Sequence, residues 1–90
     1  MTPTPIKLEG AMSIAKAEGL HQQLEAALRE YSCIEIDASE VSRVDTAIVQ
    51  LLASFLTDAE NSGVQVSWRS VSDEMKEGVR LLGMDQILSF

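Results

Sequence analysis

Cysteine and histidine are scarce in this chain, and their scarcity excludes several kinds of chemistry. The one cysteine, Cys33, has no second cysteine with which to form an internal disulfide, which agrees with a reducing compartment. His21 is the only histidine, and no zinc-ligand spacing, Gly-rich phosphate loop or Ser-His-Asp set is present. We therefore expect neither a metal nor a cofactor, and a catalytic role is the weakest hypothesis.

Positive charge and long apolar segments are scarce as well. Seven Lys and Arg residues stand against fourteen Asp and Glu residues, a net charge of −7, and no basic cluster reverses it locally. Because nucleic-acid phosphates repel an acidic surface, we expect no nucleic-acid partner. The longest apolar run, residues 47–56, is interrupted by Gln50 and Ser54 and is far shorter than the roughly 20 residues that cross a bilayer. Residues 1–7 lack the features of a signal peptide, so we expect a cytoplasmic protein that does not insert into a membrane.

The pattern of apolar residues predicts one α/β domain over residues 1–90. The prolines within residues 1–5 predict a frayed, extended lead-in. Strands are predicted at residues 6–8, 33–37, 64–68 and 87–90. Amphipathic helices are predicted from about Ser13 to Tyr31, over residues 46–60 and from Ser72 to Gly83. This alternation is typical of a layered α/β fold with right-handed crossovers.

The predicted ends of the helices depend on individual residues. Residues 38–44 are predicted to be a loop, after which Asp45 offers a side-chain oxygen to the free N–H groups of the next helix. Ser72 is predicted to cap the last helix, and Gly83 to stop it in the left-handed conformation. The core face of that helix is expected to consist of Met75, Val79 and Leu82.

The helix over residues 46–60 has two contrasting faces when successive residues are rotated by about 100°. The face expected to join the core contains Ile48, Leu51, Leu52, Phe55, Leu56 and Ala59, with Val49 at its margin. The opposite strip is small or polar and uncharged, and contains Thr46, Gln50, Ala53, Ser54 and Thr57. Since exposed helix faces usually carry Glu and Lys, this strip indicates close contact with another protein. A merely solvated face is the alternative interpretation.

Thr46 stands at the first helical position, where its hydroxyl is expected to project outward near the positive end of the helix dipole. A phosphate there would add a charge of about −1.5 to −2, which the helix tolerates but an uncharged interface does not. Thr46 is therefore a candidate phosphoacceptor whose modification would switch docking. The alternative is that Asp45 and Thr46 only cap the helix.

The segment Val44-Asp-Thr-Ala-Ile-Val-Gln-Leu-Leu52, with the preceding strand Ile34–Asp37 and the later Leu81-Leu-Gly-Met84, resembles a STAS domain over nearly the whole chain. The resemblance implies a small mixed β-sheet flanked by helices. It also implies a bacterial, non-catalytic signalling module of the anti-sigma-factor antagonist type, in which Thr46 matches the residue that a partner kinase phosphorylates. In such partner switching the unmodified antagonist binds an anti-sigma factor that is itself a serine kinase, and phosphorylation ends the binding.

A second group of short STAS domains resembles the chain equally well. These are accessory subunits of a phospholipid-transport ABC complex, which bind its ATPase through the same helix and carry an Asp-Thr pair like Asp45-Thr46. Ile48 stands where the family usually has glycine, and the helical rotation places it toward the core. Under either resemblance, the partner-binding residues would be Asp45, Thr46, Gln50, Ala53, Ser54 and Thr57. Binding of a nucleotide or small ligand by the domain alone is a third hypothesis.

Overall fold

The computed structural model describes residues 3–88, which form a three-stranded sheet and three α-helices. The strands are β1 (Thr4–Met12), β2 (Cys33–Val44) and β3 (Gln65–Val71), and the helices are α1 (Ala17–Glu30), α2 (Thr46–Asn61) and α3 (Asp73–Leu81). A short 3₁₀ turn, η1 (Ile14–Lys16), leads into α1. The predicted α/β class is confirmed. In the described part of the chain all strands pair in parallel, in the order β1-β2-β3, whereas the resemblance implies a mixed sheet.

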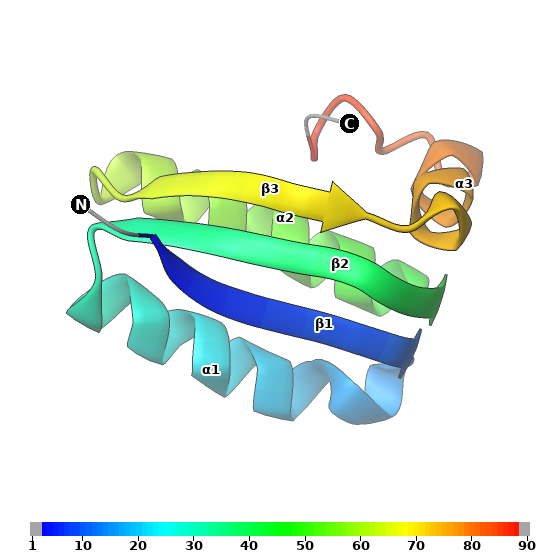
Figure 1. Cartoon of the computed structure of the whole chain (residues 1–90), viewed down its shortest axis with the longest axis horizontal. Helices are drawn as coiled ribbons and strands as arrows, with labels where there is room; N and C mark the ends of the chain where they lie inside the picture. Colours follow the sequence, from blue (N-terminus) through cyan, green and yellow to red (C-terminus); the bar gives the residue numbers. More distant parts are fainter. Residues whose placement is uncertain (1–2, 89–90) are drawn as a thin grey trace.

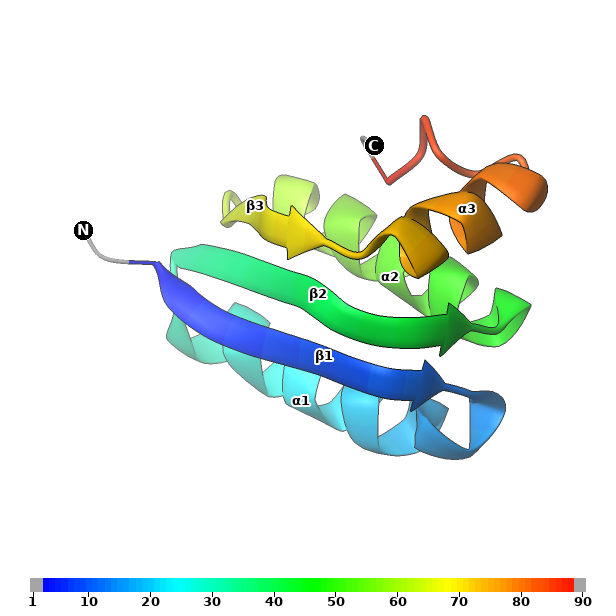
Figure 2. The same ribbon diagram turned by 45° about the vertical axis from the view of Figure 1, so that its right-hand side comes forward.

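Helices cover one face of the sheet and leave the other open. α1 and α2 run along the same face, and α3 lies beside the carboxyl ends of the strands (Figures 1 and 2). The strand order β1-β2-β3 means that the two crossovers progress across the sheet in one direction, and their helices fall on the same side, as right-handed crossovers require. Along β2, Ile34 and Ile36 are fully buried toward the helices, while Glu35 and Asp37 alternate onto the open face.

The first strand begins earlier than the sequence pattern predicts. Thr4 and Pro5 belong to β1, so the frayed lead-in expected over residues 1–5 does not hold for these two residues, and residues 1–2 lie outside the described chain. Pro5 lies opposite Glu35 of β2. β1 is an edge strand, and proline is accepted there because one side of the backbone needs no partner strand.

The loop predicted over residues 38–44 is wrong, because β2 continues without a break to Val44. Its last residues pair with β1 as far as Met12 opposite Val44, with irregularities in the register. Past Asp37 the buried residues of β2 are Ala38 and Val41, which are three positions apart. A regular strand buries every second residue, so this spacing conceals the strand from the sequence pattern. The pairing with β1, and not the local pattern, therefore sets the length of β2.

The predictions for the end of the chain are mixed. Ser72 caps α3 by accepting a hydrogen bond from the Met75 N–H, and Gly83 has a φ of +70°, so both predictions are confirmed. Leu82, the C-cap residue just past the end of α3, is exposed, so the predicted core face is wrong for Leu82 and holds for Met75 and Val79, which are completely buried.

The strand predicted over residues 87–90 is wrong for Ile87 and Leu88, which lie in a turn, and residues 89–90 lie outside the described chain. Leu88 is buried, and its carbonyl accepts a hydrogen bond of 3.0 Å from Trp68 Nε1. Side-chain packing and this hydrogen bond, and not pairing with another strand, fix the position of the segment.

Candidate protein-docking site

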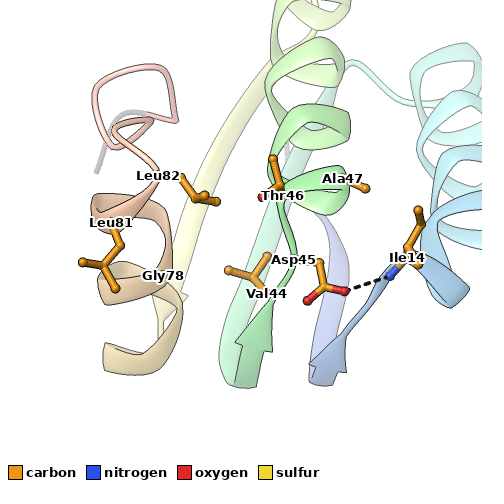
Figure 3. Close-up of a pocket in the computed structure, with 8 residues that line it drawn as sticks. All are labelled: Ile14, Val44, Asp45, Thr46, Ala47, Gly78, Leu81 and Leu82. Carbon is orange, nitrogen blue, oxygen red and sulfur yellow. Dashed lines mark hydrogen bonds between the residues drawn. The ribbon is translucent and has the colours of Figure 1, made fainter.

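The start of α2 is held at the carboxyl edge of the sheet by Asp45. The Asp45 N–H donates to the carbonyl of Met12 at the end of β1, and the Asp45 carbonyl accepts from the N–H groups of Ile48 and Val49. Asp45 is thus the N-cap residue by position. The side-chain cap predicted for it is wrong, because Oδ2 accepts instead from the Ile14 N–H at 3.3 Å (Figure 3). The carboxylate therefore connects α2 to η1. η1 lies close to Asp45 because it directly follows β1, the strand that pairs with the end of β2.

An open groove with a volume of about 540 Å³ surrounds the first turn of α2. We call it the front groove; it is lined by Ile14, Val44, Asp45, Thr46, Ala47, Gly78, Leu81 and Leu82. Figure 3 shows α3 on one side of this turn and η1 on the other, with Thr46 between Leu82 and Ala47. Thr46 is exposed, and its hydroxyl makes no hydrogen bond within residues 3–88. The hydroxyl is therefore open to a partner.

Exposed apolar side chains gather around the front groove. Five large apolar residues are exposed in the described chain: Ile14, Tyr31, Leu81, Leu82 and Ile87. Three of them line this groove, with exposed fractions of 69% for Ile14, 72% for Leu81 and 40% for Leu82. Ile14 and Leu81 are not among the binding residues predicted from the sequence. The signal that could have found Leu81 is the rotation of about 100° per residue, which places Leu81 outside the face shared by Met75, Val79 and Leu82.

Gly78 lets α3 approach the end of β2 closely. A Cβ atom on Gly78 would lie 3.0 Å from Cγ1 of Val44, closer than side chains ordinarily pack. The missing side chain therefore contributes to the shape of the front groove, which both residues line.

A second groove, of about 520 Å³, runs along the opposite side of α2, toward α1. We call it the side groove; it is lined by Ala17, Glu18, His21, Ala47, Gln50, Leu51 and Ser54. The front and side grooves together are called the docking face. Gln50 and Ser54, predicted from the sequence as binding residues, are exposed and line the side groove.

Two of the predicted binding residues lie outside both grooves. The Thr57 hydroxyl donates to the Ala53 carbonyl one turn earlier, at 3.2 Å. Ala53 itself is half-buried and packs against the core. The structure thus brings Asp45 and Thr46 together in one groove and Gln50 and Ser54 in the other.

The charged side chains that line the docking face are few and mainly acidic. Asp45 is the charged residue of the front groove, and Glu18 lies with His21 in the side groove. Arg43 approaches Asp45 only loosely, with 3.7 Å between Nε and Oδ1.

On the outer surface of α3, Arg80 donates to both carboxylate oxygens of Glu77, at 2.6 and 3.2 Å. This hydrogen bonding, together with the positive charge of Arg80, lowers the pKa of Glu77 below its ordinary value. Arg80 is therefore engaged by its own helix and does not neutralise Asp45.

The inner face of α2 makes the docking face a fixed platform. Ile48, Val49 and Leu52 are completely buried, Phe55 and Ala59 nearly so, and Leu51 and Leu56 are half-buried. The predicted core face is confirmed, and Val49 belongs to its centre and not its margin. Burial of each large side chain contributes about 1.5–3 kcal/mol, so these contacts hold α2 against the sheet.

The fold and this surface define a small α/β domain suited to contact with another protein. The chain belongs to the STAS domain family: a family model described as "Mlab, STAS domain" matches residues 2–89. Members of this family are protein-interaction modules and are generally non-catalytic. No curated protein matches the chain. None of the helices in the described chain has the length and apolarity that a membrane crossing requires.

Proposed function

We propose that this chain is a non-catalytic module that docks a partner protein through the docking face. The observation that carries the proposal is the exposed Thr46 in a groove rimmed by Ile14, Leu81 and Leu82. Scattered exposed leucines are ordinary, but apolar side chains gathered around one hollow mark an interaction site. The uncharged strip of Gln50 and Ser54 extends this surface along α2.

One candidate partner is an anti-sigma factor that is also a serine kinase, with Thr46 as its substrate. The exposed, unbonded hydroxyl of Thr46 supports this role. A phosphate there would lie near the N-terminus of α2, which favours negative charge. It would also lie next to Leu82, in the apolar rim of the front groove, where its bulk and its charge would hinder apolar packing. Phosphorylation would then end docking without unfolding the domain.

The second candidate partner is the ATPase of a phospholipid-transport ABC complex, with this chain as a permanent accessory subunit. The family description "Mlab, STAS domain" and the Asp45-Thr46 pair favour this candidate. The apolar rim of the front groove also favours it, because permanent interfaces are more apolar than transient ones. Thr46 would then be a contact residue and not a substrate.

The experiment that tests the docking proposal is an affinity pull-down from the source cell with wild type, Thr46→Glu and Thr46→Ser. We expect wild type and Thr46→Ser to recover the same partner, and Thr46→Glu to recover at least about tenfold less, equivalent to about 1.4 kcal/mol. Equal recovery by Thr46→Glu would overturn the proposal. Mass measurement of the wild-type protein separates the candidates, because a kinase partner leaves phosphate on Thr46 and an ATPase partner does not.

The ligand-binding hypothesis is tested separately. If the domain acts through protein contacts alone, calorimetry of the purified protein with ATP or GTP should detect no binding. Saturable heat with either nucleotide would replace the docking proposal with a ligand-binding one.

A further inference from the structure

We infer that the partner segment occupying the front groove is both apolar and positively charged, with an aliphatic or aromatic side chain among Ile14, Leu81 and Leu82 and an Arg or Lys at Asp45. This inference rests on the proposed function and adds the chemistry of the partner.

The apolar half of the inference follows from the rim of the groove. Ile14 precedes α1, whereas Leu81 ends α3 and Leu82 follows it, so two distant parts of the chain place apolar side chains around one hollow (Figure 3). Val44 and Ala47 add further apolar surface inside it. Binding to such a lining is most favourable for a partner side chain without polar atoms, because apolar surface is then removed from water on both sides.

The charged half follows from Asp45. A partner that covers the groove removes water from the Asp45 carboxylate, whose side chain is 37% exposed. One oxygen, Oδ2, keeps its hydrogen bond from Ile14, but Oδ1 has only Arg43 at 3.7 Å. A carboxylate buried without a close cation or donor is costly, so a purely apolar or an acidic segment would bind poorly. An Arg or Lys on the partner removes this cost.

Arg43 does not supply the missing charge. Its side chain is 66% exposed and its contact with Asp45 is longer than a hydrogen bond. Lys16, the basic residue of η1, donates instead to the carbonyl of Glu9. Glu18 adds a second carboxylate in the side groove. A partner cation is therefore attracted to the whole docking face.

A second copy of this chain is a poor occupant of the groove. Each copy carries a net charge of −7, so two copies repel each other, and docking of equal surfaces would bring acidic groups together. The occupant that fits is a different protein with a basic, amphipathic segment.

The test uses a displayed library of random 12-residue peptides, selected on the wild-type domain. We expect the selected peptides to combine large apolar residues with Arg or Lys. Their complexes should shift the amide signals of Thr46 and Ala47 in two-dimensional NMR spectra. We expect Leu81→Ser and Asp45→Asn each to weaken binding at least about tenfold, and added salt to weaken binding to wild type more than to Asp45→Asn.

Matched controls accompany both variants. Ile87→Ser removes another exposed apolar residue outside the groove, and Glu60→Gln removes an exposed carboxylate at the far end of α2. Both controls should bind within about twofold of wild type. Asp45→Asn keeps an oxygen that can accept from the Ile14 N–H, so the start of α2 should be preserved, as the NMR spectrum will show.

The outcomes separate this inference from the proposed function. Peptides that shift Thr46 and Ala47 but lack basic residues, or bind Asp45→Asn as well as wild type, overturn the inference and leave docking intact. Peptides that bind without shifting these amides, or a library without enriched peptides, overturn both. A wild-type dimer that Leu81→Ser dissociates assigns the groove to a second copy and overturns the inference.

Discussion

Ser72 joins α3 to the sheet through one hydroxyl. Its Oγ donates to the carbonyl of Val41 at 2.6 Å and accepts from the N–H of Met75 at 3.1 Å, and both hydrogen bonds are buried. Met75 in turn is completely buried in the core. Because α3 carries Leu81 and one wall of the front groove, Ser72 helps to position the site from a distance.

Replacement of Ser72 by alanine should therefore destabilise the protein. Loss of both hydrogen bonds leaves buried polar groups without this partner, which costs about 1–3 kcal/mol. The free energy of unfolding in urea measures the effect. Ser67→Ala, at an exposed position of β3, is the control and should change stability by less than about 0.5 kcal/mol. Equal effects of the two substitutions would contradict the assigned role of Ser72.

Gly78 offers a second prediction at the scale of single residues. Alanine in a helix is about 1 kcal/mol more favourable than glycine, but a Cβ here would lie 3.0 Å from Val44. We expect Gly78→Ala to be neutral or destabilising in wild type, and stabilising when introduced into Val44→Ala. Urea unfolding of the four proteins gives the coupling energy, which should exceed about 0.5 kcal/mol. The same stabilisation in both backgrounds would refute the contact.

At the scale of elements, α2 and α3 contribute different parts of the candidate site. α2 buries one face in the core and presents Thr46, Gln50 and Ser54 on the other, so its position is fixed while its outer surface stays available. α3 is shorter and buries Met75 and Val79. Its outer surface carries the Glu77–Arg80 ion pair. The rim of the groove therefore depends on how well α3 is held.

The ion pair of α3 predicts a small dependence of stability on pH. Arg80 lowers the pKa of Glu77 below its ordinary value of 4.5, so in acid the unfolded chain binds this proton more readily than the folded one. The stabilisation is thus complete above pH 4.5 and is lost as the pH falls through the lower folded pKa. Wild type should be more stable than Glu77→Gln at neutral pH, and the difference should vanish in acid, as thermal unfolding across pH can measure.

Two checks accompany this pH prediction. The difference should be small and should shrink in concentrated salt, because both side chains are exposed. Glu60→Gln, which removes an exposed carboxylate outside the ion pairs of residues 3–88, should show no such loss in acid. A wild-type advantage that persists at the lowest pH would show that Glu77 acts through something other than its charge.

At the scale of the whole molecule, the open face of the sheet is the unusual feature. Parallel sheets are commonly covered on both faces, but here the uncovered face carries polar and charged side chains such as Glu35, Asp37 and Arg69. Lys7 on β1 pairs with Glu40 of β2, and the hydrogen bond and negative charge of Glu40 raise the pKa of Lys7. A single layer of helices is enough because only one face of the sheet is apolar.

A single apolar layer predicts that the protein unfolds as one unit. Trp68, the only tryptophan, is half-buried and is hydrogen-bonded to Leu88, so its fluorescence reports on β3 and the C-terminal segment. Far-UV circular dichroism reports mainly on the helices. In urea the two signals should change with the same midpoint, as expected for a small single domain. Separate midpoints would mean that β3 and the C-terminal segment unfold independently of the helices.

The sequence alone determined the features that depend on neighbours within one helical turn. The core face of α2, the cap at Ser72 and the left-handed Gly83 all follow from side chains and backbone groups within about four residues. The exposure of Thr46 follows from the same rotation. These local rules also carried the family resemblance, which the match over residues 2–89 confirms.

Only the tertiary structure decided the features that join distant segments. Pairing with β1 extended β2 through residues that look like a loop. The carboxylate of Asp45 accepts a hydrogen bond from Ile14, 31 residues earlier in the chain, and not from the N–H groups of its own helix. The front groove exists because the fold places η1 and α3 on either side of the first turn of α2. Such contacts depend on which backbone and side-chain groups the folded chain brings together. The local periodicity of apolar residues carries no information about these distant partners.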